Sequence, residues 1–167
     1  MSELHNLGDL FVHTLRHVYD AEQRLTKALP KMAKTAEDAQ LRQALTSHLH
    51  ETKTHVQRIE RVFGLFNQAP NADTGDALKG VVKASEDTIK LGAANAVKDA
   101  AIIAAAQEAE HYEIAAYGTL RTWAQVLDKP EAVQLLERTL DEEKQADQRL
   151  TAIASSLNFQ AAAAASR

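Results

Sequence analysis

The sequence places glutamates where long helices would need apolar side chains. Apolar residues recur every three or four positions along four stretches of the chain, which is the spacing of one face of an α-helix. A carboxylate interrupts each stripe near its middle: Glu22, Glu51, Glu110 and Glu143. Burial strips a carboxylate of water, so it must be paired, protonated or bound to a cation. These positions therefore predict cation binding inside a helical core.

Further donors lie one helical turn from these glutamates: His48, His55, Glu113 and Asp147. Spacings of three and four residues keep two side chains on one face of a helix. His48 is the favoured nitrogen ligand, and His55 is the alternative. Glu113 and Asp147 are either additional ligands or solvated residues one step away from the core.

The carboxylates would meet at one depth if the four helices pack antiparallel, and there they would repel one another strongly. Two ions about 3.5–4 Å apart, bridged by two of the glutamates, would neutralise this charge. Oxygen-rich ligands with imidazole suit iron or, as the alternative, manganese. Pairing with core lysine or arginine is disfavoured, because the same faces carry no obvious partner. The predicted metal ligands are Glu22, His48, Glu51, Glu110, Glu113, Glu143 and Asp147.

Other polar and aromatic residues have simpler interpretations. Gln107 is expected to make an interhelical hydrogen bond, and His111 to point to a flank. Tyr19 and Tyr117 are interpreted as core aromatics, although a tyrosine beside iron could also bond a ligand. Four histidines are interpreted as surface or interface residues: His5, His13, His17 and His50.

The elements that must position these residues are helical throughout. The chain of 167 residues has only six glycines and three prolines, and no stretch shows the alternation of a strand. The stripes predict helices over 7–29, 41–63, 103–124 and 133–154. Pro30 should kink or break the first helix before a short continuation to about Ala36. We expect an all-α, antiparallel four-helix bundle over 1–158, with a flexible Ala-rich tail over 159–167.

A long crossover should join the two halves of this bundle. Residues 67–75 have the composition of a loop, and an amphipathic segment follows over 76–91. Its apolar residues are expected to contribute to a dimer surface: Leu78, Val81, Val82, Ile89 and Leu91. The crossover should therefore carry an additional short helix.

Composition excludes several classes of function. A net charge of −4 gives no electrostatic case for nucleic acid or an anionic membrane as partner. The absence of cysteine excludes disulfides, thiolate catalysis and cysteine-held metal. No apolar stretch approaches the roughly 20 residues of a membrane helix, and no secretory signal is evident. We expect a cytoplasmic protein.

Several runs of the sequence resemble the YciF-type family of bacterial ferritin-like stress proteins. They are LFVHTL (10–15), YDAEQRLTKALPK (19–31), SHLHET (47–52), IAAAQ (103–107), EHYEIA (110–115), YGTL (117–120) and TLDEEKQ (139–145). The resemblance covers about 4–157 and implies a rubrerythrin-like bundle, a homodimer and a di-iron centre. It matches Glu22, Glu51, Glu110 and Glu143 to the family's four core glutamates. Glu113 completes a Glu-x-x-Glu of the rubrerythrin type.

The predicted metal centre is compatible with two functions. In the first, two iron ions react with O2 or peroxide during a stress response, with electrons from an unknown outside donor. In the second, the protein is a non-catalytic, metal-stabilised dimer with a structural or stress-protective role. Iron storage in a large cage is a third possibility, which the expected dimer disfavours.

Overall fold

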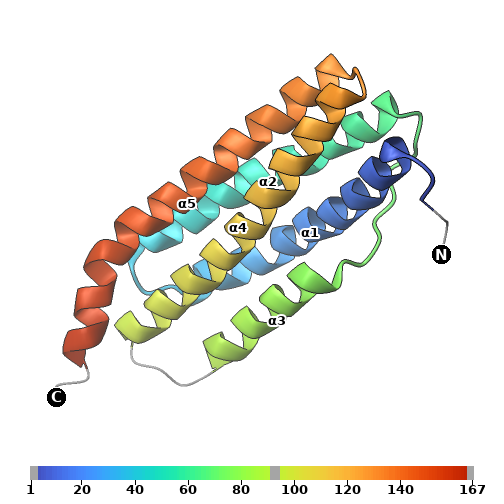
Figure 1. Cartoon of the computed structure of the whole chain (residues 1–167). Coiled ribbons are helices and arrows are strands. Elements are labelled where there is room, and N and C mark those ends of the chain that lie inside the picture. The colour runs from blue at the N-terminus through green and yellow to red at the C-terminus, as the bar shows by residue number, and fades with distance from the viewer. Residues whose placement is uncertain (1–3, 91–94, 165–167) are drawn as a thin grey trace.

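The chain folds into five α-helices in the computed structural model, which describes residues 4–90 and 95–164 (Figure 1). The helices are α1 (Leu7–Thr35), α2 (Ala39–Leu65), α3 (Asp76–Lys90), α4 (Asn95–Val126) and α5 (Pro130–Ala164). The described residues contain no strand, so the predicted all-α class is confirmed. None of these helices combines the length and the apolar character that crossing a bilayer requires.

Two helical hairpins form the bundle. Figure 1 shows that α1 and α2 run antiparallel, as do α4 and α5, and that the chain returns along the bundle between α2 and α4. The returning segment carries α3, which lies outside the four long helices. This is the predicted bundle with a long crossover. Of the apolar residues predicted for the crossover, Leu91 and the side chains of Leu78 and Ile89 lie outside the described part of the structure.

Helix boundaries follow local chemistry, and α4 begins at Asn95 where the apolar stripe predicted a start at residue 103. Asn6 caps α1 by accepting a hydrogen bond from the Asp9 N–H, at 3.0 Å. α1 is not broken at Pro30, which lies on the exposed face, where water can bond the carbonyl left without its helical donor. α5 continues to Ala164, into the segment 159–167 for which a flexible tail was predicted, in keeping with the high helix propensity of alanine.

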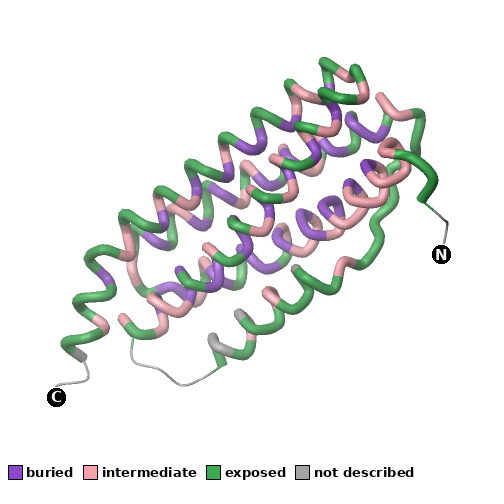
Figure 2. Tube along the Cα trace, viewed as in Figure 1, coloured by how far each residue is buried: buried purple, intermediate pink, exposed green. Residues whose placement is uncertain are grey.

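The core consists of two apolar clusters separated along the bundle by a polar layer. One cluster includes Leu25, Leu45, Ile102 and Leu150. The other includes Leu15, Ile59, Leu120 and Leu136. Figure 2 shows the buried stripe of each long helix facing the inside of the bundle. Each helix passes from one cluster to the other, so the residues between them meet at one depth.

Asp99 fixes the start of α2 against α4. Its carboxylate is almost fully buried and accepts hydrogen bonds from the backbone N–H groups of Glu37 and Asp38, at 2.9 and 2.7 Å. Asp38 in turn caps α2 by accepting from the Leu41 N–H. Asp99 was not among the residues predicted from the sequence to have a role. This contact sets how two of the four site-bearing helices lie against each other.

Replacing Asp99 by alanine should destabilise the fold. Two N–H groups would lose their acceptor, at a cost of about 1–3 kcal/mol each where they stay buried. Urea unfolding of Asp99→Ala would measure this loss. Asp141→Ala, which removes an exposed aspartate of α5, is the control and should change the free energy of unfolding much less. Equal effects of the two substitutions would contradict the role given to Asp99.

Candidate metal centre

The polar layer gathers carboxylates and imidazoles from all four long helices. α1 supplies Glu22, α2 supplies His48 and His55, α4 supplies Glu110 and Glu113, and α5 supplies Glu143. All six residues are at most 5% exposed. The layer therefore holds ionisable groups almost without water, between two apolar clusters.

The layer contains two groups of donors that share Glu143. In the first, His48, Glu110, Glu113 and Glu143 each offer a donor atom, and these atoms lie within 4.8 Å of one another. In the second, the same holds for Glu22, His55 and Glu143. A carboxylate has two oxygens, so Glu143 can serve both groups.

The imidazoles face these groups through defined nitrogens. His48 Nε2 lies 3.1 Å from Glu110 Oε1 and 3.7 Å from Glu143 Oε2. His55 Nδ1 lies 2.8 Å from Glu143 Oε1 and 3.3 Å from Glu22 Oε1. The Nδ1 atom of His55 has no hydrogen bond of good geometry, in spite of these short distances. Its lone pair can therefore be given to a cation.

Most carboxylate oxygens of the layer lack a hydrogen-bond partner, which is the test of whether the residues fit metal ions. The unpaired atoms are Glu22 Oε2, Glu110 Oε2 and both side-chain oxygens of Glu113 and Glu143. Buried polar atoms are nearly always paired in folded proteins. Among the described residues, no lysine or arginine lies within ion-pair distance of these four glutamates. The donor set of hard oxygens and imidazole fits iron or manganese.

The ring nitrogen of each histidine that faces away from the layer contacts a glutamate, and this glutamate in turn binds an arginine. His48 Nδ1 lies 3.3 Å from Glu51 Oε2, and Arg149 donates to the same oxygen at 2.7 Å. On the other side, His55 Nε2 lies 2.8 Å from Glu142 Oε2. Such carboxylate partners fix the tautomer and the orientation of an imidazole that ligates a metal.

The glutamate that contacts His55 binds its arginine through two hydrogen bonds, whereas Glu51 accepts one from Arg149. Arg58 donates to both oxygens of Glu142, at 2.6 and 2.9 Å. Although burial raises the pKa of Glu142, its bonds to Arg58 and His55 hold that pKa below its ordinary value. Glu142 therefore stays an acceptor for His55 Nε2, and the other ring nitrogen of His55, Nδ1, faces the layer.

Tyr117 orients Glu22 from inside the core. Its hydroxyl is buried and donates to Glu22 Oε1, leaving Oε2 free. Burial and the nearby carboxylates of Glu22 and Glu113 raise the pKa of Tyr117 well above its usual range. The phenol therefore keeps its proton and remains a donor. The predicted core position of Tyr117 is confirmed, and its hydrogen bond places it against the site.

The layer is under electrostatic stress when it holds no cation. Two like charges about 4 Å apart repel by about 4 kcal/mol at an effective dielectric constant near 20. Burial, with the charges of Glu22 and Glu143, raises the pKa of Glu113 well above its usual range. Burial also raises the pKa of Glu143 to about 8, against the opposing effect of His55. Without metal, the layer must take up protons.

Five of the seven predicted ligands come together, and two do not. Glu22, His48, Glu110, Glu113 and Glu143 all belong to the two groups. Glu51 is displaced from the core and supports His48 from behind. Asp147 faces Gln107 and His111 instead, at 2.9 and 3.3 Å. The predicted interhelical bond of Gln107 is thereby confirmed.

His55 takes the place expected of Glu51, and the sequence contained the signal for it. The buried positions of α2 alternate spacings of four and three: Leu41, Leu45, His48, Thr52, His55, Ile59 and Val62. Glu51 is off this line by one position. Glu142, Arg58 and Arg149 were missed because they act across helices, where the periodicity of one helix carries no information.

The metal-free protein should lose stability as the pH rises. Glu143 holds its proton up to a pKa of about 8 in the folded state, against an ordinary value of 4.5. Burial lowers the pKa of His55, but Glu143 and Glu22 raise it to about 10, above the ordinary 6.5. Both groups therefore stabilise the fold fully below their ordinary pKa values, and this contribution is lost as the pH rises through the folded values.

Urea unfolding of chelator-treated protein at about pH 5.5 and about pH 9 would measure this loss. The free energy of unfolding should be lower at the higher pH. The drop should shrink in Glu143→Gln but not in Glu108→Gln, which alters an exposed glutamate of α4. A wild-type protein that gains stability over this range would contradict the assignment of raised pKa values.

The chain matches a family of known proteins over nearly its whole length. The family described as "Domain of unknown function (DUF892)" matches residues 6–163. The chain is 42% identical to Protein YciF of Escherichia coli (strain K12) over 149 residues, which are 89% of this chain and 90% of that protein.

Two solved structures share both fold and sequence with the chain. The E. coli stress protein YciF matches with a TM-score of 0.90 and 39% identity, over 93% of this chain and 99% of that one. YcfI from Rhodopseudomonas palustris, described as a candidate structural protein, matches with a TM-score of 0.87 and 44% identity. That match covers 89% of this chain and 95% of the other.

Proposed function

The chain belongs to the DUF892 family, which includes YciF, and from the polar layer in its core we propose that it is a di-iron carboxylate protein. The two donor groups would hold two iron or manganese ions, with Glu143 shared between them. The observation that carries the proposal is the set of buried, unpaired carboxylate oxygens. We further propose that the protein acts in stress protection, as the description of the E. coli relative suggests.

Charge balance supports two ions in preference to one. The layer holds four buried glutamates, Glu22, Glu110, Glu113 and Glu143, whose charges two divalent cations would match. Neutral imidazoles of His48 and His55 would add one nitrogen to each group. When bound, iron supplies electrons for the reduction of O2 or peroxide, and an outside donor would restore them.

The residues around the layer would control how the donors respond to a change of charge. Glu113 makes no hydrogen bond, so its carboxylate can reorient without breaking one. Glu22 is held at Oε1 by Tyr117, and the two imidazoles are held by Glu51 and Glu142. Glu143 likewise makes no hydrogen bond, so these two carboxylates could reorient while Glu22 and the imidazoles stay held.

A small apolar cavity supports the proposal that the co-substrate is a small, uncharged molecule. It measures about 30 Å³, and Leu25, Leu29, Ala106 and Ala109 line it together with Val81 and Val82 of α3. Glu110 lies at its buried side, and the exposed Lys31–Glu86 ion pair lies at its outer side. A space of this size and polarity suits a molecule such as O2 rather than a large organic substrate.

Metal binding and oxidation together test the proposal. The purified apo-protein is loaded anaerobically with Fe(II), its bound iron is counted, and absorbance is followed after addition of O2 or peroxide. We expect two ions per chain and rapid oxidation in the wild type. Glu143→Gln should bind fewer ions, because both groups lose a donor.

The matched pair Glu110→Gln and Glu108→Gln provides the control. Both glutamates lie on α4, but only Glu110 is buried in the layer, while Glu108 is exposed. Loss of iron only in Glu110→Gln would support the site. If no variant differs from the wild type, or if the wild type binds no iron, the proposal is wrong.

Filling the cavity should slow oxidation without removing the metal. Ala106→Val adds two methyl groups to the wall of the cavity, and Ala104→Val adds them to an exposed position of the same helix. We expect slower oxidation by O2 only in Ala106→Val, with both variants binding iron as the wild type does. Equal oxidation rates in the two variants would show that O2 does not reach the layer through this cavity.

A second candidate function is a structural one, favoured by the description of the R. palustris relative. Metal ions would then only join four helices within each subunit of the homodimer that the family resemblance predicts. Oxidation distinguishes the two functions. Tight binding of two ions that raises the midpoint of thermal unfolding, without reaction with O2 or peroxide beyond that of Glu143→Gln, would favour the structural role.

A further inference from the structure

A second group of metal donors lies outside the polar layer, between α1 and the crossover. His13 and His17 stand one turn apart on α1, and Asp73 belongs to the segment that connects α2 to α3. Each offers a donor atom, and these atoms lie within 4.8 Å of one another. The two imidazole rings meet edge to face, with centroids 4.4 Å apart. The histidines are half-buried and Asp73 is exposed, so water can reach the group.

The crossover is held in place at this point by its backbone. The Asp73 N–H donates to the carbonyl oxygen of Arg16 at 3.3 Å. Two residues further on, Gly75 packs against α1 so closely that a β-carbon on it would lie 3.4 Å from the His17 β-carbon. Asp73 therefore sits opposite the two histidines because its own backbone and Gly75 both contact α1.

Two imidazoles and one carboxylate are a donor set that binds borderline divalent cations. Donors that share one Zn²⁺ at 2.0–2.2 Å can be at most about 4.4 Å apart, so small side-chain rotations would complete the site. We propose that His13, His17 and Asp73 form a peripheral site for a divalent cation of the Zn²⁺ type. Water would fill the remaining coordination positions on the exposed side.

A cation at this site would tie the crossover to α1. The crossover carries α3, whose Val81 and Val82 wall the apolar cavity beside Glu110. Apart from the backbone bond of Asp73, the contacts of residues 66–75 with α1 are van der Waals contacts such as that of Gly75 and the stacking of Phe66 on Phe11. The site would therefore act as a clamp on the segment that covers the cavity.

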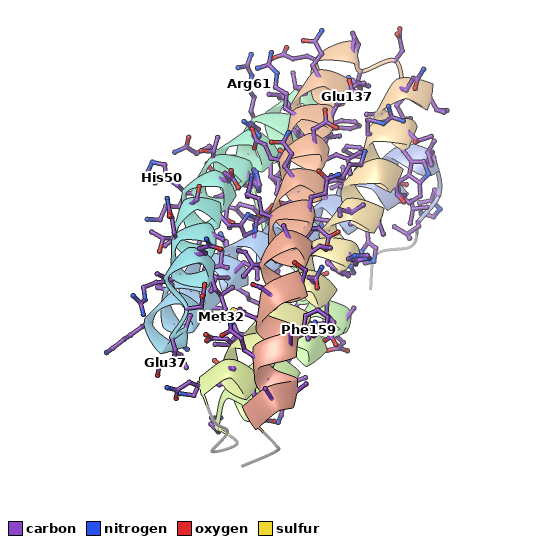
Figure 3. All side chains as sticks on the ribbon, turned by 90° about the vertical axis from the view of Figure 1, so that its left-hand side faces the viewer. Met32, Glu37, His50, Arg61, Glu137 and Phe159 are labelled. Atoms are coloured by element: carbon purple, nitrogen blue, oxygen red, sulfur yellow. The ribbon has the colours of Figure 1, made fainter. Side chains whose placement is uncertain are left out.

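The experiment uses the full chain and Zn²⁺ alone as the probe. Equilibrium dialysis counts the bound Zn²⁺, and NMR follows the imidazole signals of the histidines. His17→Gln and Asp73→Asn test the site, and His50→Gln is the control, because His50 points away from the bundle on α2 (Figure 3). Zn²⁺ can also enter the polar layer, so the informative quantity is the difference between variants.

We expect His17→Gln and Asp73→Asn to bind one equivalent of Zn²⁺ less than the wild type and His50→Gln. In the wild type, the signals of His13 and His17 should shift with that equivalent, and Glu143→Gln should retain it. The proposal is overturned if all variants bind the same number of ions, or if the His13 and His17 signals do not move. These outcomes are independent of whether the polar layer binds iron.

Amide hydrogen exchange tests the clamp separately. Zn²⁺ should slow exchange in residues 66–75 of the wild type and of His50→Gln, but not of Asp73→Asn. Binding of the extra equivalent with unchanged exchange in this segment would overturn the clamp and leave a simple surface site.

Discussion

The repulsion between four carboxylates buried in one layer is the constraint on which the arrangement of the surrounding residues depends. Glu22, Glu110, Glu113 and Glu143 come from three helices and lie between two apolar clusters that exclude water. In such surroundings, like charges cannot coexist without protons or cations. The fold brings these charges together by packing long amphipathic helices in register. The register itself depends on apolar residues above and below the layer and on contacts such as that of Asp99.

The arrangement around the layer follows from that constraint. Two histidines of α2 face the carboxylates, and each is backed by a glutamate that an arginine holds. The arginine charges are thus kept at the rim, where they neutralise Glu51 and Glu142 and leave most oxygens of the inner carboxylates without a hydrogen bond. An arginine placed inside the layer would have satisfied these oxygens and removed their capacity for metal. Carboxylates placed in this way beside imidazoles orient histidines that ligate a metal.

Much of this could be predicted from the sequence, because helices bury a regular stripe. Glu22, Glu110 and Glu143 interrupt clear apolar stripes, so their helices were predicted, although α4 begins eight residues earlier than expected and α5 ends later. The prediction for Glu51 was wrong because several buried positions of α2 are themselves polar. His48, Thr52 and His55 continue the spacing of Leu41 and Leu45, whereas Glu51 is only adjacent to it.

Contacts between different elements of the fold could not be predicted from the spacing of residues along one helix. Asp147 shares a face with Glu143, but Gln107 of α4 bonds it at the edge of the bundle, and the small Ala146 occupies the buried position. In the same way, nothing in the sequence around Asp73 places it beside His13 and His17, since that contact depends on the path of the crossover. Periodicity identifies which face of a helix is buried, but it does not identify the partners that another helix supplies.

A crystal structure of the protein grown with Fe(II), with anomalous scattering recorded on both sides of the iron absorption edge, would test the proposed di-iron centre most directly. We expect two iron peaks in the polar layer, one among His48, Glu110, Glu113 and Glu143 and the other among Glu22, His55 and Glu143. A layer without anomalous peaks, in which protonated carboxylates bond one another, would contradict it.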